Sequence, residues 1–141
     1  MMLQEFVGRY KGKKVDFDGM YGAQCVDLVR QYFQDVWGLR KNEQPEGVNG
    51  AEDFYFKHES RPIQKRLCDC VMYKPGMIPP TGAVAVFRSW QDNRFGHIGI
   101  VIAANENVID LFEQDGFAQD GAKITKWRYD RLAGWLLKKE Q

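Results

Sequence analysis

The sequence predicts an α+β fold in which N-terminal helices pack on a C-terminal antiparallel sheet of about five to six strands. Near the start, apolar residues recur at helical spacing, at Leu3, Phe6, Val7 and Tyr10. From Thr81 onward the apolar pattern changes to the alternation typical of strands. Helices that come first and strands that come afterwards indicate an α+β domain.

Two helices and a long connection precede the predicted sheet. A short amphipathic helix opens the chain, and a second is expected over residues 24–37, ending at Gly38. Residues 42–80 hold all five prolines and are predicted to be irregular, with a short helix near 51–57. Long loops in compact domains often form binding sites. The strands are predicted at 83–87, 97–103, 108–113, 124–129 and 132–137.

Length and charge limit the class of protein. The 141 residues suit one domain, taken as residues 1–141. Lys and Arg number 20 and Asp and Glu 19, a balance that gives no reason to expect nucleic acid or a membrane surface as a partner. No signal peptide is visible, and no apolar stretch approaches the ~20 residues of a transmembrane helix. We therefore expect synthesis in a reducing cytoplasm, with Cys25 as a free thiol.

Cys25 and His97 form the most informative pair. Helical periodicity begins directly after Gln24, so the Cys25 thiol is expected in the first turn of a helix, where the dipole and free N–H groups favour a thiolate. His97 opens a run that is typical of a buried strand, whereas His58 lies in a charged segment and is expected to be exposed. Alone, Cys25 would fit a core cysteine and His97 a structural histidine. Together they have the layout of a papain-like thiol hydrolase, with Cys25 as nucleophile and His97 as general base and then acid.

Counting residues outward from the turn of the predicted hairpin suggests which group orients the His97 ring. If Ala103 pairs with Asn107, His97 falls directly opposite Glu113, and opposed residues share a face with Cβ atoms ~5 Å apart. A register that differs by one residue places His97 opposite Gln114 instead. The choice between these registers stays open at this stage.

Glu113 interrupts an apolar face, so its carboxylate needs a partner, and His97 is the obvious one. The alternative is a salt-bridged carboxylate at a sheet edge. Asp115, just past the strand end, is the second choice for the orienting acid. The backbone N–H of Cys25 is a candidate donor to the oxyanion of an acyl-transfer intermediate, and the side chain of Gln24 is a further candidate donor.

The twelve residues 16–27 have features of a calcium loop. Acids occupy positions 1, 3 and 12, as in the ~12-residue loop of EF-hands, and positions 5 and 7 could offer backbone carbonyls. The match is imperfect because position 12 is Asp and position 9, Gln24, cannot both bind calcium and line the oxyanion site. The alternative is a solvated acidic turn that caps the helix. The candidate calcium ligands are Asp16, Asp18, Met20, Gly22 and Asp27.

Three blocks of sequence resemble the CHAP domain, the cysteine, histidine-dependent amidohydrolase/peptidase family of bacterial and phage cell-wall lysins. The blocks are Asp16-x-Asp18-Gly19-x-Tyr21-x-x-Gln24-Cys25-x-Asp27-Leu28, Gly96-His97-Ile98-Gly99-Ile100-Val101 and Phe112-Glu113-Gln114-Asp115. The resemblance spans nearly the whole chain, and the first block is its most specific part.

The resemblance implies a papain-like fold and cleavage of peptidoglycan amide bonds, as an N-acetylmuramoyl-L-alanine amidase, an endopeptidase or both. By resemblance, Cys25, His97 and Glu113 form the triad. Phage members often carry Asn two residues after the triad acid, a place held here by Asp115.

The resemblance also bears on calcium. Some phage members bind it through acids that match Asp16, Asp18 and Asp27. Two further side-chain ligands of such members match Met20 and Gly22, which cannot serve in that way.

The implied partner is bacterial peptidoglycan. The absence of a visible signal peptide resembles phage endolysins, which accumulate in the host cytoplasm before they act on the wall. A partner subunit or a wall-binding module elsewhere is a further expectation. Two alternatives stay open: a virion or tail component that keeps the fold for assembly or wall binding, and a thiol hydrolase of a non-wall amide.

Overall fold

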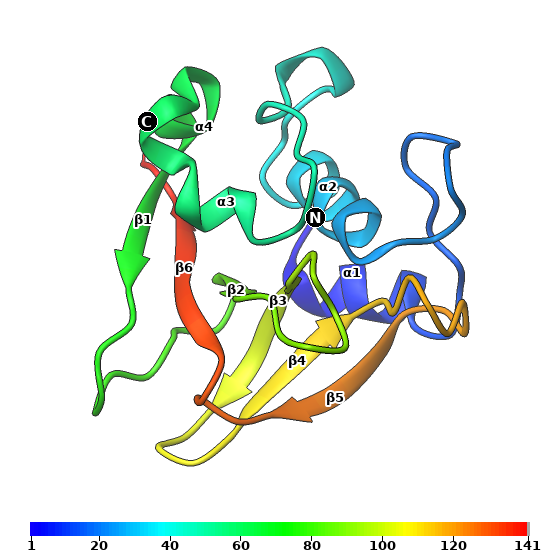
Figure 1. The fold of residues 1–141 in the computed structure, drawn as a ribbon. Coiled ribbons are helices and arrows are strands. Elements are labelled where there is room, and N and C mark those ends of the chain that lie inside the picture. The colour runs from blue at the N-terminus through cyan, green and yellow to red at the C-terminus, as the bar shows by residue number, and fades with distance from the viewer. Residues whose placement is uncertain (141) are drawn as a thin grey trace.

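The computed structural model describes residues 1–140 and has the predicted α+β architecture (Figure 1). The helices are α1 (Leu3–Tyr10), α2 (Cys25–Asp35), α3 (Asp53–Phe56) and α4 (Pro62–Leu67), with 3₁₀ turns at Lys41–Glu43 and His58–Ser60. The strands are β1 (Cys68–Met72), β2 (Val84–Phe87), β3 (His97–Ala104), β4 (Ile109–Glu113), β5 (Lys123–Trp127) and β6 (Leu132–Lys138). They form one antiparallel sheet in the order β1-β6-β2-β3-β4-β5, which confirms the predicted fold class.

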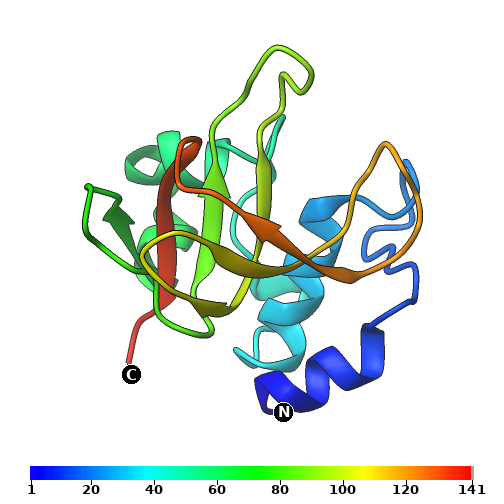
Figure 2. The ribbon, with the colours of Figure 1, turned by 90° about the horizontal axis from the view of Figure 1, so that it is seen from below.

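Helices α1 and α2 pack against one face of the sheet, as Figures 1 and 2 show. Their apolar stripes bury Phe6 and Phe33 completely. The Phe6 ring meets Phe112 of β4 edge to face, with centroids 6.0 Å apart. Full burial of one such side chain stabilises the fold by roughly 1.5–3 kcal/mol. This packing fixes the start of α2, and with it Cys25, against the central strands.

The other face of the sheet carries a second apolar cluster, which includes Phe87, Val101 and Leu111. Side chains alternate between faces along a strand, so His97 shares this second face with Val101, and Glu113 shares it with Leu111. The helix that bears Cys25 therefore lies on one face, while the side chains of His97 and Glu113 belong to the other.

The prediction of an irregular segment over residues 42–80 is wrong in part. The short helix expected near 51–57 is present as α3, but the segment also contains α4 and β1. Pro62 begins α4, where its missing N–H leaves no hydrogen bond unmade. Strand β1 lacks a strong alternating pattern and is defined by its pairing with β6 at the sheet edge.

The expectation of an exposed His58 is also wrong. Its exposed fraction is 7%, and its Nδ1 lies 2.8 Å from Nε2 of the fully buried Gln64. Burial lowers the pKa of His58, because it disfavours the charged ring. This histidine belongs to the packing around α4.

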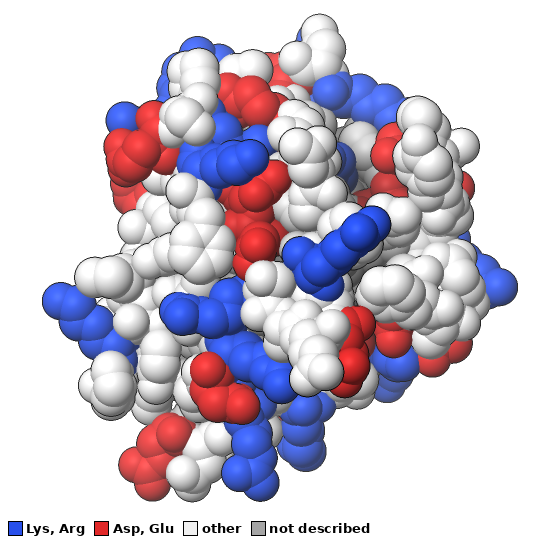
Figure 3. Space-filling view, in the orientation of Figure 1, with Lys and Arg blue, Asp and Glu red and all other residues white. Residues whose placement is uncertain are grey.

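Acidic and basic side chains are interspersed over the face shown in Figure 3, as expected from a formal net charge of +1. Within residues 1–140, no helix combines the length and the apolar character that crossing a membrane requires.

Candidate active site

Cys25 and His97 line the same cleft, which has a volume of about 820 Å³. The loop that precedes α2, residues 44–51, residues 93–97 and residues 115–117 provide its walls. Cys25 is the first residue of α2 and is half-buried. The first N–H groups of a helix have no intrahelical partner and carry the positive end of its dipole. The cleft thus holds a thiol at a point of positive potential.

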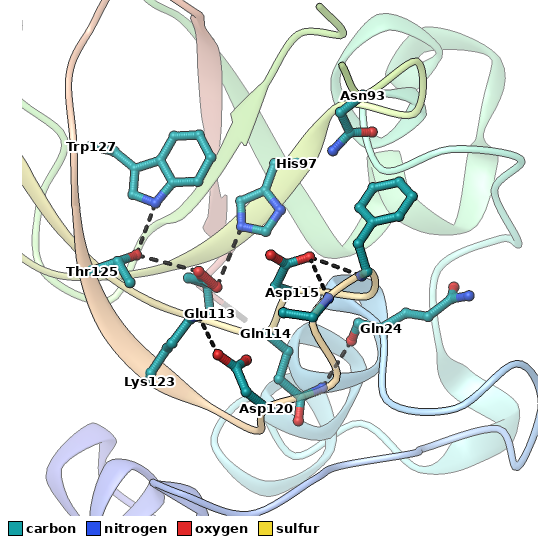
Figure 4. Close-up of polar contacts among 12 residues, drawn as sticks. Gln24, Asn93, His97, Glu113, Gln114, Asp115, Asp120, Lys123, Thr125 and Trp127 are labelled. Atoms are coloured by element: carbon teal, nitrogen blue, oxygen red, sulfur yellow. Dashed lines mark hydrogen bonds and ion pairs between the residues drawn. The ribbon is translucent and has the colours of Figure 1, made fainter.

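His97 and Glu113 form a buried pair, shown in Figure 4, and His97 shares its cleft with the thiol of Cys25. His97 Nε2 lies 3.7 Å from Glu113 Oε2, and the two residues are 6% and 4% exposed. Neither of these two atoms has a hydrogen-bond partner among the described residues. At 3.7 Å the contact is an ion pair rather than a hydrogen bond, and each atom has the other as its polar neighbour.

The surroundings of His97 favour its charged form. Burial by itself lowers the pKa of the ring, but the close approach of the Cys25 and Glu113 side chains outweighs this effect and raises the pKa of His97 to about 9. Nε2 of His97 faces Glu113, so Nδ1 is the ring nitrogen that remains open to another partner. At neutral pH the His97 ring is therefore protonated.

The predicted hairpin register is wrong by two residues. Ile100 pairs with Phe112 and Val101 with Leu111, which places Glu113 across from Gly99 rather than from His97. A shift of two residues keeps the same face, so His97 and Glu113 meet as diagonal neighbours.

Gly99 makes this diagonal contact possible. A Cβ at Gly99 would lie 2.6 Å from the Leu111 side chain and 3.1 Å from Glu113 Cβ. A larger residue there would occupy the space beside the Glu113 side chain.

Two further residues that the sequence singled out, Asp115 and Gln24, also line the cleft. Asp115 Oδ1 accepts hydrogen bonds from the N–H groups of Phe117 (2.8 Å) and Ala118 (3.3 Å), so it caps a turn. No ion pair within the described residues joins it to His97. The Gln24 side chain is exposed, and Figure 4 shows it extending away from His97. Its role as an oxyanion donor stays a prediction.

Sequence reasoning missed a buried glutamine that ties these elements together. Gln114 is fully buried; its Oε1 accepts from Val15 N–H at 2.7 Å, and its Nε2 donates to Val15 C=O and Gln24 C=O, both at 2.9 Å. One side chain thus links the strand that carries Glu113 to both ends of the loop before Cys25. Its position directly after Glu113 was the signal available in the sequence.

Gln119 makes a second link of the same kind. Its side chain accepts from Ala23 N–H at 3.1 Å and donates to Ala23 C=O at 3.0 Å. Gly22 has a φ of 75°, and a Cβ there would lie 2.7 Å from Gln119 Oε1, so glycine is required at this position. The two glutamines together hold the loop before α2 against the end of β4.

Asp16, Asp18 and Asp27 form an acidic cluster in that loop. One carboxylate oxygen from each lies within 4.8 Å of the others. Calcium binds oxygen at 2.3–2.6 Å, so two ligands of one ion lie at most about 5 Å apart, and the three acids fit one ion. Asp27 is buried and its Oδ2 accepts from Gln24 N–H at 2.9 Å; burial first, and the charges of Asp18 and Asp16 next, raise the pKa of Asp27 to about 6.

Of the two other ligands suggested by the sequence, Met20 has an exposed side chain and Gly22 has none. Either residue could contribute to a calcium site only through its backbone carbonyl, as positions 5 and 7 of the EF-hand loop pattern suggested.

An α+β fold that brings a helix-terminal cysteine and a strand-borne histidine into one cleft defines the class of papain-like cysteine hydrolases. Residues 14–115 match the family model described as CHAP domain, and the chain belongs to this family. Membership implies a cysteine-dependent hydrolase.

The chain is similar to phage endolysins. It is 31% identical over 129 residues to "Endolysin LysK" of Staphylococcus phage K. This alignment covers 85% of the present chain and 22% of LysK. Two solved structures share the fold. Wild-type endolysin LysIME-EF1 matches with a TM-score of 0.66 and 19% identity, over 96% of this chain and 61% of the solved one. Ly7917 matches with a TM-score of 0.67 and 13% identity, over 94% of this chain and 59% of the solved one. The chain thus spans about a fifth of LysK and less than two thirds of each solved chain.

Proposed function

We propose that this chain is an endolysin-like catalytic domain that hydrolyses an amide bond of peptidoglycan, as an N-acetylmuramoyl-L-alanine amidase, an endopeptidase or both. The observation that carries the proposal is that Cys25 and His97 line one cleft, and that His97 forms a buried pair with Glu113. Family membership and the likeness to LysK support peptidoglycan as the substrate.

In the first half-reaction, the Cys25 thiolate attacks the carbonyl carbon of the scissile amide and forms a tetrahedral intermediate. The free N–H groups at the start of α2 donate to its oxyanion. The intermediate then breaks its C–N bond as the His97 imidazolium gives its proton to the departing amine, which leaves a thioester on Cys25.

In the second half-reaction, neutral His97 takes a proton from water, and the resulting hydroxide equivalent attacks the thioester. Breakage of the C–S bond releases the carboxylic acid and restores the thiolate–imidazolium pair. Glu113 holds the ring in orientation and stabilises its charged form throughout.

Digestion of purified Gram-positive cell walls tests this function. We expect loss of turbidity, with mass spectrometry of the released fragments showing either stem peptides that begin with L-alanine or new amine and carboxyl ends within the peptides. New reducing sugar ends, or no release from walls of several chemotypes, would contradict the proposal. A wall-binding module or partner subunit stays a prediction.

We further propose that Asp16, Asp18 and Asp27 hold calcium, which would neutralise the three acids and fix the loop that runs into Cys25. Support comes from the convergence of their oxygens within 4.8 Å and from the links that Gln114 and Gln119 make between this loop and β4.

Calcium should therefore raise the melting temperature of chelator-stripped protein. A ligand present at 100 times its Kd stabilises the folded state by about 2.7 kcal/mol, which corresponds to roughly 10 °C for a domain of this size. Magnesium should do so poorly because it demands octahedral geometry and keeps its waters. Titration calorimetry measures the binding directly.

The double variant Asp16→Ala with Asp18→Ala should lose this response and part of its activity. Asp92→Ala with Asp130→Ala, which removes two exposed acids from other loops, is the matched control and should keep the response. No heat of binding at millimolar calcium, with unchanged melting and lysis after chelation, would leave only a turn that caps the helix.

A further inference from the structure

The indole ring of Trp127, on β5, stacks on the imidazole of His97. The ring centroids are 4.7 Å apart and the planes are inclined by 9°. Trp127 is itself held by Phe87, whose ring centroid lies 4.6 Å away. Trp127 is half-buried and is absent from the cleft lining, so it touches His97 from the side away from the substrate cleft.

The same indole begins a chain of hydrogen bonds that ends at Glu113 (Figure 4). Trp127 Nε1 donates to Thr125 Oγ1 at 2.9 Å, and Thr125 Oγ1 donates to Glu113 Oε1 at 3.4 Å. The direction is fixed, because an indole N–H only donates and a carboxylate only accepts, so the hydroxyl proton of Thr125 must point to Glu113. Oε1 is thereby engaged and Oε2 is the oxygen that faces His97.

Few charged groups face His97. Cys25 from α2 and Glu113 from β4 act on it electrostatically, whereas Phe87 from β2 and Trp127 from β5 are uncharged. Lys123, across from Glu113 on β5, pairs with Asp120 at 2.7 Å. An imidazolium over an indole face is favoured by the negative potential of the ring.

We propose that Trp127 and Thr125 are positioning residues of the catalytic pair: the indole face orients the His97 ring and favours its charged form, and Thr125 turns Glu113 toward it. This inference rests on the proposed function in taking His97 as the acid–base group. It concerns the protonation of His97, however, which is measurable without any substrate.

NMR titration of the histidine ring protons is the test. The chain has two histidines, and burial lowers the pKa of His58 while that of His97 is raised, so the two transitions separate. We expect Trp127→Leu to lower the pKa of His97 by about half a unit to one and a half units, the range of a cation–π contact. Trp127→Phe keeps a ring face and should retain most of the shift.

Trp90→Leu is the matched control. The Trp90 ring lies 6.0 Å from that of Trp127, and Arg131 lies over its face. It does not stack on His97, so its loss should leave the His97 titration unchanged. The titrations are repeated in Cys25→Ser protein, where the thiol no longer titrates together with the ring.

Thr125 supplies the second pair of variants. Thr125→Val removes the donor to Glu113 and leaves the indole N–H unpartnered, so it should lower the pKa of His97 and reduce kcat about tenfold with little change in KM. Thr125→Ser keeps the hydroxyl and should restore both values. If Trp127→Leu does not fold, Trp127→Phe and the Thr125 pair decide the question.

An unchanged pKa of His97 in folded Trp127→Leu and Thr125→Val proteins would overturn the proposal. The stacking of Trp127 on His97 would then contribute only to packing. A change confined to KM would also contradict it. Failure of the wall-hydrolysis proposal would look different, since the wild-type protein would release nothing from walls while the histidine titrations still moved as described.

Discussion

A Cys25→Ser variant should fold like the wild-type chain and release nothing measurable from cell walls, a loss of at least about 1,000-fold. Serine is close to cysteine in size, and the half-buried site at the start of α2 accepts a hydroxyl. A hydroxyl, however, is far too weak an acid to give up its proton to His97 as a thiol does. Turbidity and fragment release measure activity, and a melting curve within a few degrees of wild type checks the fold.

Cys70→Ser is the matched control for this change. Cys70 is also a half-buried free cysteine, on β1, and burial raises the pKa of its thiol to about 11. The Cys70 thiol therefore stays protonated at neutral pH, and no histidine of the described residues contributes to its pKa, so this variant should hydrolyse walls at nearly the wild-type rate. Comparable lysis by folded Cys25→Ser protein would remove Cys25 from the nucleophile role.

The positions of Cys25 and His97 in the fold could be predicted because each depends on a local pattern. A helical period that starts at residue 25 places the thiol at a helix N-terminus, and an apolar run that starts at His97 places the imidazole at a strand end. The structure has both features. Their meeting in space was an inference from the class of enzyme and not from the pattern.

The hairpin register could not be predicted because it depends on a local irregularity. The ladder shifts between Val101 and Ala103, and the turn closes on Asn105, whose side chain accepts from the N–H groups of Asn107 and Val108. Together these moved the pairing by two residues from the assumed one. The prediction kept the correct face because side chains alternate with a period of two.

The contacts that Trp127, Thr125 and Gln114 make also could not be predicted from the sequence. Trp127 and Thr125 sit on an edge strand in a half-buried alternating pattern, which an ordinary amphipathic strand would also produce. Gln114 is a polar residue that links parts of the fold through its hydrogen bonds to the backbone groups of Val15 and Gln24, which are far away in the chain. Such tertiary hydrogen bonds have no periodic signal.

The choice between the two candidate acids yields the last prediction: Glu113→Gln should lower kcat by about 10² to 10⁴-fold, while Asp115→Asn should have a small effect. Glu113 is buried 3.7 Å from His97, and glutamine keeps its volume but not its charge. The acceptor that Asp115 offers to Phe117 and Ala118 survives in asparagine, so its turn persists.

The pH dependence distinguishes a charge effect from a loss of structure. The pKa of His97 is raised to about 9 in the folded chain, above the ~6.5 of an unfolded one, so its contribution to stability is fully present below pH ~6.5 and is lost as the pH rises through 9. Removal of the Glu113 charge lowers this pKa. The basic limb of kcat/KM should therefore move to lower pH, and the fall in melting temperature between pH 6.5 and 9 should become shallower.

Asp115→Asn should leave both profiles in place, because Asp115 makes no ion pair with His97 within the described residues. The two variants are compared over the whole pH range, since a folding defect in Glu113→Gln would lower activity at every pH without moving the limb. If Asp115→Asn instead shifts the basic limb and Glu113→Gln does not, the orienting acid is Asp115. The ion pair seen between His97 and Glu113 would then be a structural contact of the sheet.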